Sequence, residues 1–430
     1  MANFKHPETI GLHGGEYRSD PATTAVAVPI YQTSSYQFKD AETAANLFGL
    51  KEFGNIYSRL GNPTVGALEA RLTDLEEGAM CVALSSGTSA VMYSLINIMS
   101  QGDNFVTANQ LYGGTYTMFD NILPEYGIDS KKVDITDLKA VEDAIDDKTR
   151  AIYCETITNP GLVVADVTAL SEIAHSKGIP LIVDATFTTS AIQKSCEFGA
   201  DIVVYSLTKW MSGHGRVIAG AVIEKGGFDW GNGNFPLYDK PDTSYGGMRW
   251  GHDLGDLSSV AYSLRLRTVP LRNLGANMSP ETAFEVMSGL ETLGLRMDRH
   301  CENAIKAAEY LSDHELVEWI RYPGLKDDPA YELSEKYLKG TGGTMVVFGI
   351  KGGKDAGQKF IDNLKMFRHV ANVGDTRSLA IHPASTTHSQ LDDEQLVAAG
   401  APPELVRLSI GIEDIEDIIE DLSQALESTR

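Results

Sequence analysis

A lysine and an aspartate stand at the ends of two apolar runs of this chain, and together they suggest a specific chemistry. Lys209 ends the segment DIVVYSLTK, residues 201–209, and Asp184 ends the segment PLIVD, residues 180–184. A lysine amine forms a Schiff base with an aldehyde, and an aspartate keeps a pyridine nitrogen protonated so that the ring accepts electrons. Because an unpaired buried lysine is costly, a merely structural Lys209 is the weaker interpretation. The pair therefore predicts pyridoxal 5′-phosphate (PLP) as cofactor, with Lys209 as catalytic residue.

A small polar turn provides candidates for binding the phosphate of such a cofactor. The apolar run 79–84 is followed by SSGTSA, residues 85–90. Backbone N–H groups at a helix N-terminus bind a phosphate dianion well, and glycine lets the backbone approach closely. Two hydroxyl residues beside Lys209 can add further donors. The predicted phosphate-binding residues are Ser86, Gly87, Thr88, Ser206 and Thr208. A turn of this composition also commonly just caps a helix.

Three further polar or aromatic residues follow predicted strands and are candidates for contacts with the cofactor ring. Asn159, in TNPG after the run 150–155, is placed to hydrogen-bond a phenolic oxygen. Tyr112, in LYGGTY after the run 104–108, is placed to stack on a pyridine ring. Thr186, two residues after Asp184, is assigned to the same set. A turn asparagine and a packed core tyrosine are the alternatives, but their recurrence at strand ends favours one shared site.

The elements that must position these residues alternate along the middle of the chain. Apolar, strand-like runs separated by helix-like stretches occupy 79–84, 104–108, 150–155, 180–184, 201–206 and 217–224. This alternation predicts an α/β fold with a mostly parallel sheet flanked by helices. Ligands bind such sheets at the carboxyl ends of the strands, where the candidates fall.

The rest of the chain predicts an arm and a smaller second domain. Residues 1–60 carry little periodicity and are expected to form an arm that reaches a neighbouring subunit. Residues 61–265 form the predicted large domain, and 266–430 a smaller α/β domain. In the latter, one long helix is expected from Ser279 to about 311, since Pro280 suits the first helical position. Its predicted strands are 315–321, 344–350, 379–381 and 406–410.

Composition excludes several classes of function. The chain has 430 residues and a formal net charge of −23, which disfavours nucleic acid and anionic membranes as partners. No stretch approaches the roughly 18 to 20 apolar residues of a membrane span. The four cysteines have no metal-ligand spacing, so no metal is expected. The N-terminus lacks the basic and apolar regions of a signal peptide, which predicts a cytoplasmic protein.

Along essentially its full length the chain resembles the Cys/Met-metabolism group of fold-type I PLP enzymes. The resemblance rests on YSLTKW followed by GHG around Lys209, on SGT at 86–88 and on YSRLGNPT at 57–64. It implies a seven-stranded, mostly parallel sheet and a smaller C-terminal domain. It also implies that Tyr57 and Arg59 reach the phosphate of a neighbouring subunit's cofactor, and hence a homotetramer built as a dimer of catalytic dimers.

Within this group, three segments are similar to the O-acetylhomoserine sulfhydrylases: NMSP at 277–280, GLETL at 289–293 and GDTRSLAIHPASTTHSQL at 374–391. The resemblance implies PLP-dependent γ-replacement, in which O-acetylhomoserine and sulfide give homocysteine and acetate for methionine biosynthesis. It implies that Arg407 grips the substrate carboxylate. The other substrate-binding residues so assigned are Asn159, Arg377 and Ser378. Lys209 would move the protons, with Tyr112 or Tyr57 assisting.

Other activities of the same group stay open. Lyases and cystathionine synthases usually carry an acidic residue where this chain has Arg377, and methionine γ-lyases carry a cysteine where it has Gly113 or Gly114. Ala185, Ser190 and the pair Tyr245-Gly246 depart from common family residues. The alternatives are therefore methionine γ-lyase, O-succinylhomoserine sulfhydrylase and cystathionine γ-synthase, or, more remotely, a non-catalytic α/β binding protein. No GxGxxG follows the first strand to suggest a nucleotide cofactor.

Overall fold

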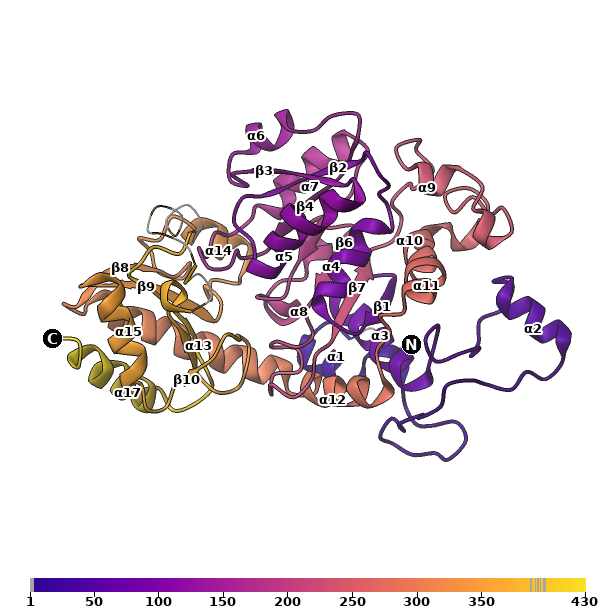
Figure 1. The fold of residues 1–430 in the computed structure, drawn as a ribbon. Helices are drawn as coiled ribbons and strands as arrows, with labels where there is room; N and C mark the ends of the chain where they lie inside the picture. The colour runs from indigo at the N-terminus through magenta and orange to yellow at the C-terminus, as the bar shows by residue number, and fades with distance from the viewer. Residues whose placement is uncertain (1–3, 387–388, 391, 393, 395, 397–399) are drawn as a thin grey trace.

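The computed structural model describes residues 4–386, 389–390, 392, 394, 396 and 400–430. The chain builds two separate β-sheets, each packed with helices, and an N-terminal segment that runs along the outside (Figure 1). Three residues of the sulfhydrylase-like segment, Thr387, His388 and Leu391, lie outside the described residues.

The first sheet has seven strands in the order β1-β7-β6-β5-β4-β2-β3. The strands are β1 (Met80–Leu84), β2 (Asn104–Ala108), β3 (Asp129–Val133), β4 (Thr149–Glu155), β5 (Leu181–Asp184), β6 (Ile202–Tyr205) and β7 (Gly220–Glu224). All pairings are parallel except those of β7, which runs antiparallel to β1 and β6. The predicted mostly parallel sheet is confirmed. Its edge strand β3 escaped prediction because DSKKV has no apolar run.

Helices cover this sheet and remove its central strands from solvent. Every residue of β4 and β6 is buried, as expected of strands covered on both faces. The helices that contact the sheet include α3 (Pro63–Glu76), α4 (Gly87–Ile96), α7 (Val167–Ser176) and α10 (Ala261–Leu266). Helix α4 begins three residues after β1 ends, which brings its N-terminus to the carboxyl edge of the sheet.

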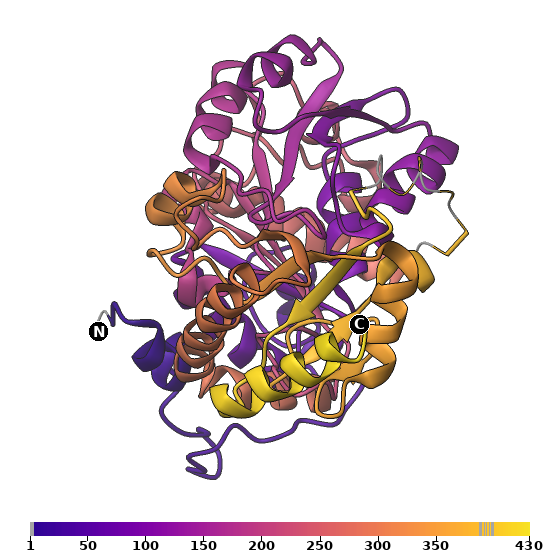
Figure 2. The same cartoon turned by 90° about the vertical axis from the view of Figure 1, so that its left-hand side faces the viewer.

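The second sheet has five strands in the order β10-β11-β12-β9-β8. The strands are β8 (Val317–Arg321), β9 (Met345–Ile350), β10 (Arg368–His369), β11 (Leu379–Ile381) and β12 (Leu405–Ser409). Helices α13 (Leu293–Ser312) and α15 (Gly353–Asn363) pack on this sheet, and α17 (Ile415–Glu427) packs on both of these helices (Figure 2). Their shared core includes Phe348, Phe360, Val406 and Leu422. Together these elements form the expected smaller α/β unit.

The long helix expected from Ser279 is divided in two. Ser279 does cap the first helix, because its hydroxyl accepts a hydrogen bond from the N–H of Thr282 and Pro280 follows it. This helix, α12, spans Pro280–Leu290, and α13 begins only at Leu293. Thr292 adopts φ −116° and ψ 12°, outside the helical range, so the single predicted helix is wrong at this point.

Helix α13 joins the two cores. Met297, in its first half, belongs to the core of the large sheet, whereas Leu311, near its end, belongs to the core of the small sheet. The side-chain packing therefore changes partners within one continuous helix. The division into 1–60, 61–265 and 266–430 stays a prediction.

The N-terminal segment lies mostly outside both cores. It carries α1 (Pro7–His13) and α2 (Ala41–Phe48) joined by irregular chain, and the stretch around α2 extends away from the body in Figure 1. Val26 and Phe53 are exposed, and their apolar side chains have little contact with the rest of the protomer. In the part of the chain that the structure describes, no helix is both long and apolar enough to cross a membrane.

Candidate active site

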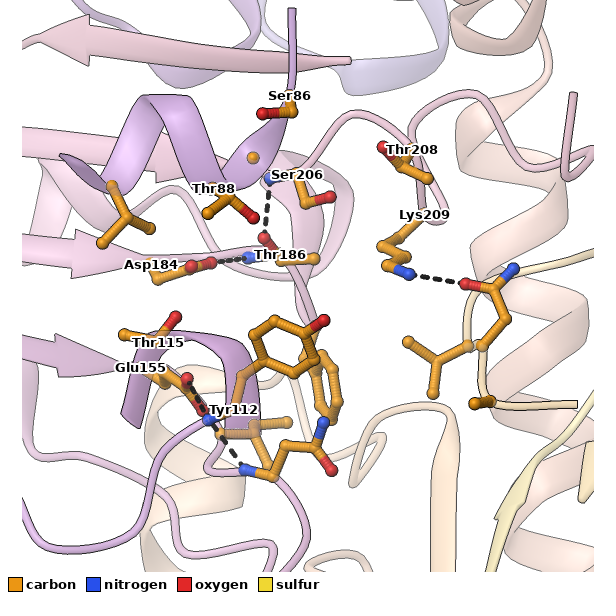
Figure 3. Close-up of a pocket in the computed structure, with 18 of the residues that line it drawn as sticks. Ser86, Thr88, Tyr112, Thr115, Glu155, Asp184, Thr186, Ser206, Thr208 and Lys209 are labelled. Atoms are coloured by element: carbon orange, nitrogen blue, oxygen red, sulfur yellow. Dashed lines mark hydrogen bonds between the residues drawn. The ribbon is translucent and has the colours of Figure 1, made fainter. Parts of the chain in front are cut away.

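A cavity of about 350 Å³ lies at the carboxyl edge of the large sheet and is closed on one side by the small domain. It brings together most of the residues that the sequence indicated (Figure 3). Those in its lining are Ser86, Gly87, Thr88, Tyr112, Asn159, Asp184, Thr186, Ser206, Thr208, Lys209 and Arg407.

Asp184 and Ser206 are connected through Thr186. The N–H of Thr186 donates to Oδ1 of Asp184 at 3.0 Å, and its hydroxyl accepts from the N–H of Ser206 at 2.8 Å. The phenol of Tyr153 lies 3.4 Å from Oδ2 of Asp184. Burial raises the pKa of the Asp184 carboxyl above its ordinary value. A cationic partner at this position would lower that pKa again, because it would stabilise the carboxylate.

The N-terminus of α4 comes into close contact with the strand end that carries Ser206. Ser86 caps this helix, since its hydroxyl accepts from the N–H of Ser89 at 3.0 Å. A Cβ added to Gly87 would lie 2.5 Å from the Cβ of Ser206, so only glycine permits this approach. Thr208, on the same side of the cavity, bonds through its hydroxyl to the main chain of Ala219. The resulting corner of N–H and hydroxyl groups is suited to an anion.

A buried glutamate that sequence reasoning missed joins two of the predicted residues. Glu155 is the last residue of β4 and is paired with Asp184 of β5. Its Oε1 accepts the N–H of Tyr112 at 2.7 Å, and its Oε2 accepts the N–H of Asn159 at 3.2 Å. Burial and the nearby Asp184 raise its pKa to about 8. One carboxyl group thus sets the distance between the loops that follow β2 and β4.

The small domain contributes a guanidinium and an amide to the cavity. Arg407, on β12, donates from one terminal nitrogen to Oδ1 of Asn159 at 2.9 Å. Its other terminal nitrogen lies 3.4 Å from the main-chain oxygen of Asn372. Burial lowers the pKa of Arg407 to about 10, which leaves it cationic at neutral pH. Asn372 follows the short strand β10 and stands between Ala371 and Val373, and nothing in its sequence context distinguishes it.

Lys209 extends from the turn after β6 toward this small-domain side (Figure 3). Its amine donates to Oδ1 of Asn372 at 2.5 Å. Burial, and secondarily the charge of Arg407, lower its pKa to about 8. A sizeable fraction of the amine is therefore neutral near pH 8 and able to accept a proton.

Two predicted substrate-binding residues lie outside the cavity lining. The guanidinium of Arg377 forms a two-point ion pair with Asp375, at 2.8 and 3.0 Å, and its side chain is 57% exposed. The hydroxyl of Ser378 donates to Glu413 at 2.9 Å and accepts the N–H of Gly411 at 2.9 Å. Asp375 and Glu413 therefore occupy the groups through which Arg377 and Ser378 were expected to bind substrate.

Tyr57 and Arg59 also lie away from Lys209 within one protomer. They line a separate hollow of about 390 Å³ beside the N-terminus of α12, together with Asn277 and Ser279. The guanidinium of Arg59 lies over the ring of Tyr57, 5.2 Å from its centroid. Nε of Arg59 is buried and has no hydrogen-bond partner among the residues that the structure describes. A cofactor contact from these residues would have to be made with another subunit.

The cavity has the donor set that PLP needs. Hydroxyl and N–H groups form an anion-binding corner. Any residue larger than glycine at position 87 would clash with Ser206 there. The carboxyl of Asp184 and the amine of Lys209 project into the same space, and the ring of Tyr112 borders it (Figure 3). A lysine and an aspartate at strand ends of a doubly covered α/β sheet, beside such a corner, define the class of PLP-binding enzymes.

The comparisons with known proteins specify the family. A model of the Cys/Met metabolism PLP-dependent enzymes matches residues 8–427. The chain is 48% identical to an O-acetyl-L-homoserine sulfhydrylase of Leptospira meyeri, across 99% of this chain and 97% of that protein. It is 45% identical to a homocysteine synthase of Schizosaccharomyces pombe, across 98% of each chain.

A solved structure shows the same fold. The crystal structure of a Campylobacter jejuni protein, described as an O-acetylhomoserine (thiol)-lyase, matches with a TM-score of 0.94 and 39% identity, across 98% of this chain and all of that one. That structure contains N′-pyridoxyl-lysine-5′-monophosphate. The chain therefore belongs to the Cys/Met metabolism family of PLP-dependent enzymes, and PLP is its cofactor.

Proposed function

We propose that this enzyme catalyses γ-replacement on O-acetyl-L-homoserine, in which sulfide displaces acetate to give L-homocysteine for methionine biosynthesis. Relatives named O-acetylhomoserine sulfhydrylase or homocysteine synthase align over nearly its whole length. The structural observation that supports the proposal is that Lys209 and Arg407 both contact Asn372. A base and a carboxylate-binding group are thereby held close together in one cavity.

Bound PLP supplies an electron sink for carbanions formed at the substrate. The carboxyl of Asp184 is placed to keep the ring nitrogen protonated. Ser206, Thr208 and the N-terminus of α4 are placed to bind the phosphate, since hydroxyl and N–H groups stabilise an anion there. These residues bind and orient PLP, whereas other residues carry out the proton transfers.

The substrate's α-carboxylate is assigned to Arg407, whose planar fork suits a bidentate pair. Asn159 orients that fork, because its Oδ1 accepts one of the guanidinium N–H groups. The neutral amine of Lys209 would remove the α-proton and pass it to the bound PLP, which makes the amine neutral again. It would then remove a β-proton, and after sulfide has added it would return a proton to each carbon. The phenol of Tyr112, whose N–H is held by Glu155, assists proton transfer at the departing acetate.

The proposed assembly is a dimer of catalytic dimers in the cytoplasm. The support for this assembly is the position of Tyr57 and Arg59. They lie outside the Lys209 cavity of their own protomer and line a separate, largely polar hollow. In this proposal they complete the phosphate site of the partner, and Tyr57 joins Tyr112 in assisting the acid–base steps. The exposed apolar residues of the arm, including Val26 and Phe53, would be covered by the neighbouring subunit.

A product assay on the purified, PLP-loaded protein tests the reaction. O-acetylhomoserine is supplied with and without sulfide, and homocysteine, acetate, 2-oxobutyrate and ammonia are measured. We expect homocysteine and acetate in equal amounts, and only when sulfide is present. Formation of 2-oxobutyrate and ammonia without sulfide, with little homocysteine, would assign the enzyme to the γ-lyases instead. O-succinylhomoserine and cysteine, supplied in parallel, distinguish the other two alternatives.

Subunit mixing tests the shared site. The variants K209A and R59A are each expected to be nearly inactive, because each lacks one part of every site. A hybrid dimer contains one site with both defects and one with neither. Co-refolded or co-expressed mixtures should therefore regain activity, and mixtures that stay inactive would contradict the proposed contribution of Arg59 to the partner.

A further inference from the structure

Asn372 contacts both cationic side chains of the cavity. It lies between β10 and β11 in the small domain, and it lines the cavity together with Ala371 and Val373. Its side-chain oxygen accepts from the amine of Lys209 at 2.5 Å, and its main-chain oxygen lies 3.4 Å from a terminal nitrogen of Arg407. No other hydrogen bond of Lys209 Nζ is found among the described residues.

This arrangement has a consequence for the proton transfers. A lysine amine is attached to four flexible carbons, so a free amine near a substrate samples many positions. In a γ-replacement it must serve two neighbouring carbons in turn. An acceptor that restricts the amine to one place beside the carboxylate-binding group reduces the entropic cost of each transfer.

We propose that Asn372 is a positioning residue whose side-chain oxygen holds the amine of Lys209 beside Arg407 whenever that amine is not covalently engaged. The inference rests on the proposed function, because a base that serves both the α- and β-carbons is what γ-replacement requires. It assigns the small domain a part in the proton transfers as well as in binding the carboxylate.

The neutrality of the acceptor matters as much as its position. The groups around Lys209 are Arg407 from β12, Tyr112 at the start of α5 (Gly113–Thr117), and the carboxyls of Asp184 and Glu155 from β5 and β4. An amide oxygen directs the amine without adding charge to this set. A carboxylate at position 372 would stabilise the ammonium form and raise the pKa of Lys209, leaving less neutral base near pH 8.

Three substitutions separate these contributions in the PLP-loaded protein. N372L keeps the branching of asparagine but has no acceptor. N372D keeps an acceptor and adds charge, and N372S keeps a shorter acceptor. The first readout is hydrogen exchange in D₂O at Cα and Cβ of L-2-aminobutyrate, followed by NMR. This amino acid has no γ leaving group, so exchange reports on Lys209 without the replacement reaction. The second readout is the pH profile of kcat for homocysteine formation.

We expect N372L to slow exchange at Cβ by about tenfold, with a smaller effect at Cα, because a hydrogen bond to a charged or polarised amine is lost. N372S should recover part of the rate. N372D should move the acid limb of the kcat profile upward by about one pH unit, since the amine must lose its proton to act as base. Thermal unfolding midpoints should stay within a few degrees of the parent.

Wild-type exchange at both carbons in N372L would overturn the inference. So would equal losses in N372L and N372D with unchanged pH profiles, since they would show that Asn372 acts only in packing. The readouts also separate this inference from the proposed function. If the parent enzyme makes no homocysteine but exchanges both protons, the proposed reaction fails, and the exchange data alone decide the role of Asn372.

Discussion

The two sides of the cavity are built in different ways. On the large-domain side, Asp184, Thr186 and Ser206 stand at the ends of adjacent parallel strands and are joined by hydrogen bonds of 2.8 to 3.0 Å. On the small-domain side, Arg407 lies on β12 and Asn372 in the loop between β10 and β11, and both contact the first domain through their side chains. The register of one sheet therefore fixes the side chains on the large-domain side. The positions of those on the small-domain side depend on how the two domains pack against each other.

This difference matches the two tasks of the enzyme. A cofactor that stays bound benefits from a rigid site, because little reorganisation is then needed at each turnover. A substrate has to bind and dissociate in each turnover, and side chains at a domain interface can change position as it does so. Mutations on the large-domain side are therefore expected to affect PLP binding, and those on the small-domain side to affect substrate binding.

The largest effect is expected for K209A, which removes the group that both sides share. Without the amine the enzyme loses the base assigned to both proton abstractions, so turnover should fall at least about 10³-fold. The fold should survive, since alanine relieves a buried and desolvated amine. Steady-state product formation and circular dichroism measure the two effects. Substantial turnover by a folded K209A enzyme would refute the assignment of Lys209.

R407A removes the assigned carboxylate-binding group from the small-domain side and leaves the large-domain side unchanged. Loss of a buried, hydrogen-bonded partner for a carboxylate costs about 2 kcal/mol or more, so KM for the amino-acid substrate should rise roughly 30-fold or more. PLP affinity should change little, because the cofactor contacts lie on the other side. R407K, which keeps the charge without the fork, should be intermediate. Equal losses of PLP and substrate binding in R407A would show that the two sides are not independent.

Most of the large-domain side could be predicted from sequence, and most of the small-domain side could not. Lys209 and Asp184 end short apolar runs, and parallel strands bring such ends together by topology. Arg407 was inferred only from resemblance to a family, since an arginine on a strand has no local signal of function. Asn372 and Glu155 were missed, because their roles arise from contacts with residues far away in the sequence.

Arg377 shows why a role implied by resemblance still needs a test of its own. A resemblance carries over a residue type, but the side chain is directed by its own neighbours. Here the adjacent carboxyl of Asp375 forms a two-point pair with Arg377 and holds its own pKa below the usual range. The divided helix after Ser279 has a related cause, since one non-helical residue does not disturb the apolar periodicity that predicts a helix.

A smaller effect is expected for E155Q, and a second buried glutamate provides the control. Glu76 resembles Glu155, since burial raises its pKa to about 8 and it accepts the N–H of Cys196 at 3.1 Å. It contacts Tyr205 rather than the cavity. In E155Q an amide NH₂ must face one of two backbone donors, which should displace Tyr112 or Asn159 and lower kcat about tenfold. E76Q should leave kcat close to that of the parent.

The same pair predicts a pH dependence of stability. A carboxyl whose folded pKa lies near 8 binds more protons in the native state than in the unfolded state between about pH 4.5 and 8. Stability should therefore fall as pH rises through this window. The unfolding midpoint of E76Q should decline less steeply than that of the parent over the same range. An unchanged slope would indicate that Glu76 stays ionised when buried.

The smallest effect on catalysis is expected for R377A, which tests whether the small-domain side extends beyond Arg407. The Arg377 side chain is largely exposed and satisfied by Asp375, so its removal should change KM for O-acetylhomoserine less than about twofold, as is usual for exposed ion pairs. Its second contact, with the main-chain oxygen of His214 at 3.1 Å, joins the small domain to the turn that follows Lys209. A modest loss of thermal stability is expected from this contact. A rise in KM comparable to that of R407A would instead show that Arg377 turns inward when substrate binds, as its predicted role in substrate binding requires.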